Sequence, residues 1–241
     1  MLRLKLFRVG IAVVAIAAAG AARAGAIEDM IVLDRAYIPA LVLTNQPQKS
    51  AAATSESLQR LTAAWARYEA ALPPADRAAY AAAIAESDAK IKTADRLLAS
   101  GSRQAAHDAL EAVRIAFWKA RVAQGVDYYP DRLTAFHEAM EPLVDLAANP
   151  AADATKLKRH FEETSALWSR VEGARLDAAL YGFDAEKTAQ LQALIKKERG
   201  ILSQLDAAIG SGNRGELEAG AKTLKGTFSQ TLLLFGDFSG L

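Results

Sequence analysis

The chain has 241 residues, no cysteine and nearly balanced charge, with 29 lysine and arginine residues against 28 aspartate and glutamate residues. A chain without cysteine has no disulfide, no thiolate metal ligand and no covalent haem attachment. The charge balance argues against nucleic-acid binding, which needs a concentrated basic face to displace counterions. Alanine is abundant, and glycine and proline lie between apolar segments of helical period, so the sequence predicts an all-α protein.

Residues 1–24 have the pattern of a secretory signal peptide. Arg3, Lys5 and Arg8 precede an uncharged apolar run over residues 9–22, and small residues follow around Ala24, where a signal peptidase would cleave. The apolar run is shorter than the ~20 residues that a membrane-spanning helix needs. We therefore expect an exported, periplasmic protein that loses residues 1–24 and keeps no membrane span.

Four helices are predicted between residues 25 and 126. Their apolar side chains recur at steps of three and four, as in Leu58, Leu61 and Trp65 of the second helix, which is the spacing of one helix face. Proline and glycine mark their ends. The predicted helices run from Glu28 to Thr44, from a Thr54/Ser55 cap to Pro73, from Ala75 to Ala99 and from Arg103 to Gln124.

The second half of the chain repeats features of the first. A shift of 103 residues places Pro39 on Pro142, Pro47 on Pro150 and Trp65 on Trp168, which predicts an internal duplication. Four further helices are predicted, from Pro130 to Ala148, Asp153 to Leu180, Ala185 to Ile209 and Arg214 to Leu234. Short connections favour antiparallel neighbours. We therefore expect two tandem antiparallel four-helix bundles, eight helices in all, over residues 25–126 and 127–241.

A histidine and a methionine stand together at the start of the second half. His137 and Met140 are three residues apart, so they project from one helix face. Imidazole nitrogen and thioether sulfur together suit copper, and the same pair can be the axial ligands of a non-covalent, b-type haem. Glu141 lies one position further round and would attract a cation, and His160 on the following helix is a candidate further ligand. The alternative is that Met140 fills the core and His137 is hydrogen-bonded to a neighbour.

Glu198 is a carboxylate within an apolar stripe, between Leu194 and Ile201. A carboxylate that faces a core should be paired, because an unpaired charge there costs several kcal/mol. Lys225 on the following helix is a plausible partner, which predicts a structural ion pair. The alternative is a carboxylate that binds a ligand.

The sequence contains no pattern of a catalytic site: a nucleophile arrangement, a phosphate-binding loop and a His-Glu-x-x-His zinc motif are all missing. We therefore predict a non-enzymatic, exported binding protein, with a transition-metal ion such as copper or a haem as its ligand. One alternative is a cofactor-free interaction or scaffolding module of the cell envelope, which would use the apolar face of Ile115, Trp118 and Val122. Another is a carrier that holds a small organic ligand in the cleft between the halves.

Overall fold

The chain is helical throughout the computed structural model, which describes residues 7–46 and 48–241, with side chains from Ala26 onward. Ten helices and no strand occur among these residues, so the predicted all-α class is confirmed. Within the same residues, no helix combines the length and the hydropathy that crossing a membrane requires. The predicted signal peptide, residues 1–24, lies outside the part of the chain whose side chains are described, and its cleavage stays a prediction.

In the described part of the N-terminal half, four long helices are joined by short connections and one short helix. They are α1 (Phe7–Thr44), α2 (Ala51–Ala71), α3 (Pro74–Ala79), α4 (Ala81–Ala99) and α5 (Arg103–Ala123). α1 packs against α2 and α5, and α4 packs against α5 and α2. Trp65 of α2 lies edge-on to Phe117 of α5, with ring centroids 5.4 Å apart, and Leu58 and Leu61 are buried. The predicted apolar face of α2 is therefore the buried one.

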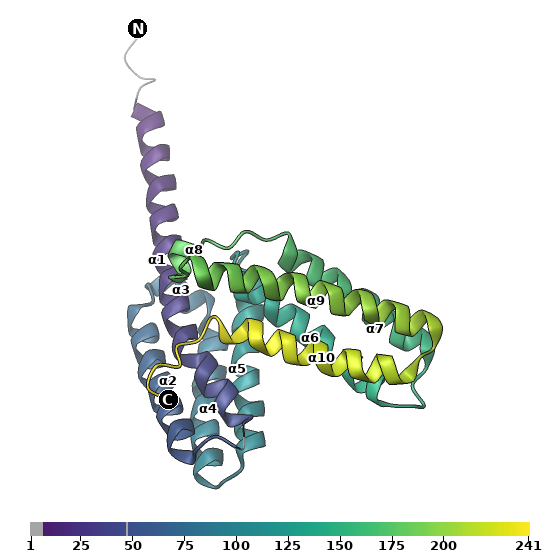
Figure 1. The fold of residues 1–241 in the computed structure, drawn as a ribbon. Helices are drawn as coiled ribbons and strands as arrows, with labels where there is room; N and C mark the ends of the chain where they lie inside the picture. Colours follow the sequence, from purple (N-terminus) through teal and green to yellow (C-terminus); the bar gives the residue numbers. More distant parts are fainter. Residues whose placement is uncertain (1–6, 47) are drawn as a thin grey trace.

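The C-terminal half has the same order of helix neighbours. It contains α6 (Tyr129–Ala148), α7 (Ala154–Glu172), α8 (Ala178–Tyr181), α9 (Ala185–Ser211) and α10 (Arg214–Leu233). α6 packs against α7 and α10, and α9 packs against α10 and α7. In Figure 1 the long helices of this half run across those of the N-terminal half, so the two sets meet at a steep angle.

The start of α2 differs from the prediction. The helix begins at Ala51 instead of following a Thr54/Ser55 cap. The reason is Ser50, whose hydroxyl accepts a hydrogen bond from the backbone nitrogen of Ala53 at 3.0 Å and so caps the first turn.

Two predicted helices are each divided, which is why ten helices occur among the described residues instead of the predicted eight. The helix predicted from Ala75 to Ala99 is interrupted at Tyr80, whose backbone departs from regular helix at φ −100° and ψ 7°. The ring of Tyr80 is buried and lies 6.2 Å from that of Phe117, so core packing accompanies the interruption. The helix predicted to reach Leu180 ends at Glu172, with Gly173 as its cap.

The two halves share one core. α5 packs against α6, and α1 packs against α10. Buried apolar side chains from both halves form a single cluster. The end of the chain returns to α1, where the backbone nitrogen of Asp237 donates to the carbonyl oxygen of Arg35 at 2.8 Å, and Figure 1 shows the C-terminus beside the helices of the N-terminal half. The halves therefore meet at α1, α5, α6 and α10.

Candidate functional site

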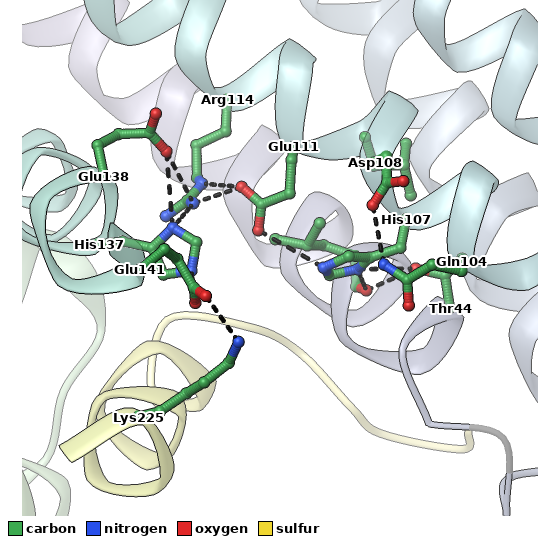
Figure 2. A network of polar contacts seen from close by, with 12 residues as sticks. Thr44, Gln104, His107, Asp108, Glu111, Arg114, His137, Glu138, Glu141 and Lys225 are labelled. Carbon is green, nitrogen blue, oxygen red and sulfur yellow. Dashed lines mark hydrogen bonds and ion pairs between the residues drawn. The ribbon is translucent and has the colours of Figure 1, made fainter. Parts of the chain in front are cut away.

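A cleft of about 540 Å³ opens where α1, α5, α6 and α10 meet, so side chains of both halves line it. Two of the three histidines of the chain lie in it, His107 from α5 and His137 from α6. Carboxylates outnumber ammonium groups among the residues that line the cleft, which include Asp108, Glu111, Glu141 and Lys225. Figure 2 shows these side chains converging from the three helices α5, α6 and α10. The cleft is therefore lined by both halves and combines charged side chains, mostly carboxylates, with apolar ones.

The α5 wall presents an oriented imidazole. His107 Nδ1 lies 2.9 Å from the carbonyl oxygen of Leu41 and 3.3 Å from Thr44 Oγ1. Because a carbonyl oxygen only accepts hydrogen bonds, Nδ1 carries a proton, and in the neutral ring Nε2 keeps its lone pair. Nε2 lies 3.7 Å from Glu111 Oε1, one helical turn further along α5. Two acceptor atoms thus face each other at the edge of the cleft.

The guanidinium of Arg114 lies between the carboxylates of Glu111 and Glu138. Its Nε donates to Glu111 Oε2 at 3.0 Å, and its terminal nitrogen contacts the same carboxylate and donates to His137 Nδ1 at 2.6 Å. The same nitrogen lies 4.0 Å from Glu138 Oε1. Glu111, His137 and Glu138 offer ligand atoms that all lie within 4.8 Å of one another, a spacing that suits a metal ion. The guanidinium of Arg114 already fills that position, as Figure 2 shows.

The α6 wall holds a second imidazole with a partner on each ring nitrogen. Arg114 can only donate, so in the neutral ring His137 Nδ1 accepts from Arg114 and Nε2 carries the proton, 3.1 Å from Glu141 Oε1. Burial and the charge of Arg114 oppose protonation of His137, but its contacts with Glu138 and Glu141 outweigh both effects and raise its pKa. Lys225 of α10 donates to Glu141 Oε2 at 2.8 Å. These contacts tie α5, α6 and α10 together along one side of the cleft.

The structure brings together two of the four residues predicted to bind a metal. His137 and Glu141 are in contact in the cleft. Met140 is completely buried in the hydrophobic core, and His160 is half-buried on α7, a helix that packs against α6 and α9. The residues that line the cleft include neither Met140 nor His160.

Sequence reasoning missed His107 and Glu111. Their spacing of four residues on a predicted helix places both on one face, and this signal was available in the sequence. What the spacing does not reveal is that this face of α5 meets α6 and α10, because helix periodicity carries no information about the neighbour that covers a face.

The ion pair predicted between Glu198 and Lys225 is not formed. Glu198 is completely buried on α9, and neither of its oxygens has a hydrogen-bond partner among the described residues. Lys225 instead binds Glu141. Burial raises the pKa of Glu198 to about 9, against a weaker opposing effect of Lys197. The side chain is therefore protonated and uncharged at neutral pH, which avoids the cost of a buried charge.

A second polar cluster lies buried where the halves meet. Arg121 of α5 binds Asp131 of α6 through Nε, which lies 3.0 Å and 2.9 Å from the two carboxylate oxygens. Tyr128 donates to Asp34 at 2.7 Å, and burial raises the pKa of Asp34 to about 6 against the opposing charge of Arg121. Under the 103-residue shift, Asp34 is the counterpart of His137. The two halves therefore bring different polar groups to their junction.

Comparison with models of known protein families, with curated proteins and with solved structures finds no match to this chain. The function is accordingly inferred from the geometry and chemistry of the cleft.

Proposed function

We propose that this chain is an exported, non-enzymatic binding protein that holds a cationic ligand in the cleft between its two halves. The observation that carries the proposal is the cleft itself, which is lined by four helices from both halves and contains more carboxylates than ammonium groups. Its volume of about 540 Å³ lies within the range of roughly 300–1,000 Å³ that is typical of ligand sites, which also favour junctions between structural units. Export is proposed from the signal-like pattern of residues 1–24.

We also propose that the two halves are tandem antiparallel four-helix bundles that arose by duplication. Support comes from the matched order of helix neighbours, in which α1, α2, α4 and α5 correspond to α6, α7, α9 and α10. The prolines and tryptophans that fall in register under the 103-residue shift support the same interpretation. Duplication places two copies of the same face together, and the differences between the copies, such as His137 against Asp34, then make the junction of the halves asymmetric.

Blocking the cleft tests the proposal without assuming the chemistry of the ligand. Ser229 of α10 lines the cleft and is exposed, so Ser229→Trp would fill part of the cleft. Ser203 is exposed on α9 and does not line it, so Ser203→Trp is a matched control. Divalent metal ions and small organic cations would be screened by thermal shift on the mature chain, since a ligand at one hundred times its Kd adds about 2.7 kcal/mol of stability.

We expect at least one class of cation to raise the Tm of the wild type and of Ser203→Trp but not of Ser229→Trp. Identical shifts in both tryptophan variants would place the ligand elsewhere and overturn the proposal. Absence of any shift in the wild type would do the same. A response to organic cations alone would favour a small-molecule carrier over a metal-binding protein, and the apolar wall containing Leu41, Phe228 and Leu232 favours that second candidate.

A haem ligand receives less support than a metal ion or an organic cation. A His/Met axial pair requires the sulfur of Met140 to reach the same space as the imidazole of His137. Met140 is completely buried in the core and does not line the cleft, so the geometry favours the polar ligand atoms of the cleft over the thioether.

The alternative of a protein-interaction module rests on a different face. Val122 of α5 is 59% exposed, and with Trp118 and Leu167 it lines a groove between α5, α6 and α7. A large exposed apolar side chain beside a half-buried tryptophan is a feature of interaction surfaces. If Trp118→Ala removed a co-purifying protein while cation binding persisted, the chain would have both functions.

A further inference from the structure

We propose that His107 and Glu111 are the primary ligands of a divalent transition-metal ion, such as Cu²⁺ or Zn²⁺, at the α5 side of the cleft. The inference rests on the proposed function of the cleft and specifies its ligand. Both residues belong to α5, line the cleft and are partly accessible, with side chains 15% and 19% exposed. Residues four apart on a helix project together, the same spacing by which helical zinc sites combine two ligands.

His107 is held in the tautomer that metal binding requires. Its Nδ1 donates to the carbonyl oxygen of Leu41 at 2.9 Å, and this carbonyl belongs to α1, so the ring is fixed from a different helix. Metal-binding histidines commonly donate the N–H of one ring nitrogen to a carbonyl or carboxylate oxygen. This hydrogen bond orients the ring and leaves the other nitrogen as the ligand. In the neutral ring, Nε2 of His107 can therefore bind a metal without rearrangement of the ring.

A hydrogen bond from Arg114 to Oε2 orients the carboxylate of Glu111. Arg114 binds Glu111 Oε2, with Nε at 3.0 Å, and leaves Oε1 as the oxygen that faces His107. Figure 2 shows Glu111 between Arg114 and His107. The carboxylate therefore has a fixed direction, as expected of a ligand that is itself hydrogen-bonded by a neighbour.

The distance between the two ligand atoms fits a metal and does not fit a hydrogen bond. His107 Nε2 and Glu111 Oε1 are 3.7 Å apart, which is too long for a hydrogen bond, and neither atom has a proton to donate in this tautomer. Zinc and copper bind nitrogen and oxygen at about 2.0–2.2 Å, which places neighbouring ligand atoms roughly 3–4 Å apart. A cation between the two atoms would relieve the repulsion of their lone pairs.

Two features define the class of metal. The pair offers imidazole nitrogen and carboxylate oxygen, which suit Cu²⁺, Zn²⁺ and Ni²⁺, whereas Cu⁺ prefers the soft sulfur ligands that this cleft lacks. Asp108 also lines the cleft, where its carboxylate accepts a hydrogen bond from Gln104 at 2.8 Å and adds negative charge near the pair. The remaining coordination positions would be taken by water or by a second ligand in the open cleft.

The neighbouring cluster of Glu111, His137 and Glu138 is the weaker candidate for the same ion. Its ligand atoms are close enough, but the guanidinium of Arg114 lies among them and donates to His137. A metal there would have to displace a buried arginine that cannot lose its charge. The unoccupied acceptor pair is on the other side of Glu111, toward His107.

The three histidines provide a direct test with a matched control. Untagged mature protein would be titrated with Cu²⁺, followed by electron paramagnetic resonance for the number of bound nitrogens and by calorimetry for the affinity. The variants would be His107→Ala, Glu111→Gln, His137→Ala and, as the control outside the cleft, His160→Ala. Circular dichroism would establish that each variant is folded. If His107→Ala failed to fold, Glu111→Gln would test the pair by itself, since it keeps the shape of the side chain.

We expect one specific copper ion in the wild type and in His160→Ala, with nitrogen coupling from an imidazole. His107→Ala should remove this signal, and Glu111→Gln should weaken the affinity by more than about tenfold. A signal that persists in His107→Ala and disappears in His137→Ala would overturn the assignment and move the site to α6. If the wild type bound no copper or zinc while organic cations still stabilised it and Ser229→Trp removed that effect, the metal inference would fail and the proposed cation-binding function would stand.

Discussion

Replacing Glu198 with leucine should stabilise the protein at neutral pH. Glu198 is completely buried on α9, and its two oxygens have no hydrogen-bond partner among the described residues. Burial raises its pKa from 4.5 to about 9. At pH 7 the group is therefore protonated in the folded protein but ionised in the unfolded chain, and this difference opposes folding.

The magnitude follows from the two pKa values. A carboxyl group whose folded pKa lies above its unfolded value binds a proton on folding. The free energy of unfolding therefore falls as the pH rises from 4.5 to about 9. Each pH unit corresponds to about 1.4 kcal/mol. Because pH 7 lies about 2.5 units above the ordinary pKa, Glu198 costs roughly 3 kcal/mol there. Below about pH 4 this protonation cost disappears, because the carboxyl group is then protonated in both states.

The assay is urea unfolding, followed by circular dichroism, at about pH 4, 7 and 8.5. Glu198→Leu should be more stable than the wild type by at least roughly 3 kcal/mol at pH 7. This gain should grow with pH and fall, near pH 4, to the smaller gain from removing a buried neutral carboxyl group. Glu198→Gln should gain less, because its amide remains buried. Asp206→Asn, on an exposed position of the same helix, is the control and should change little.

Two results would refute this reasoning. One is a Glu198→Leu protein that is less stable than the wild type at pH 7, which would mean that the carboxyl group makes a favourable contact. The other is the same pH dependence of stability in wild type and variant between about pH 4 and 8.5, which would mean that Glu198 has an ordinary pKa in the folded protein.

Further predictions concern packing and a buried ion pair. A methyl group added at Gly236 would lie 2.7 Å from the ring of Phe238, so Gly236→Ala should lower the stability by roughly 1–3 kcal/mol in thermal unfolding; an unchanged Tm would contradict the close packing. At Gly226, inside α10, nothing lies within 4 Å of an added methyl group, so Gly226→Ala should add roughly 0.5–1 kcal/mol. Asp131→Asn removes the carboxylate that binds the buried guanidinium of Arg121 and should cost about 3–5 kcal/mol in urea unfolding, and a loss below about 1 kcal/mol would show that the pair contributes little to stability.

The sequence predicted the local structure well because helix ends have local causes. The end of α1 at Thr44 and the start of α5 at Arg103 agree with the prediction. The interruption at Tyr80 does not, because it accompanies the packing of one ring against Phe117 on another helix. The residue pattern within one helix does not indicate a contact with another helix.

Some contacts of the candidate site could likewise be predicted from the sequence, and others could not. That His137 and Glu141 would be neighbours was predictable, since they are four residues apart on one helix. That Met140 belongs to the core was one of the two interpretations the sequence allowed, and burial decided between them. The pairing of Glu198 with Lys225 was predicted wrongly, because the height and rotation of α9 against α10 are set by the packing of many side chains and not by the spacing within either helix.

The sequence by itself determined the helical class, the apolar face of α2 and the spacings that place His107 with Glu111 and His137 with Glu141. Periodicity does this because each turn of an α-helix repeats every 3.6 residues whatever surrounds it. Only the tertiary structure decided that α5 and α6 face each other, that Arg114 enters between Glu111 and His137, and that a cleft remains beside them. The physical reason is that these contacts depend on how two rigid sets of helices cross, and that crossing minimises the free energy of the whole core and not of any single segment.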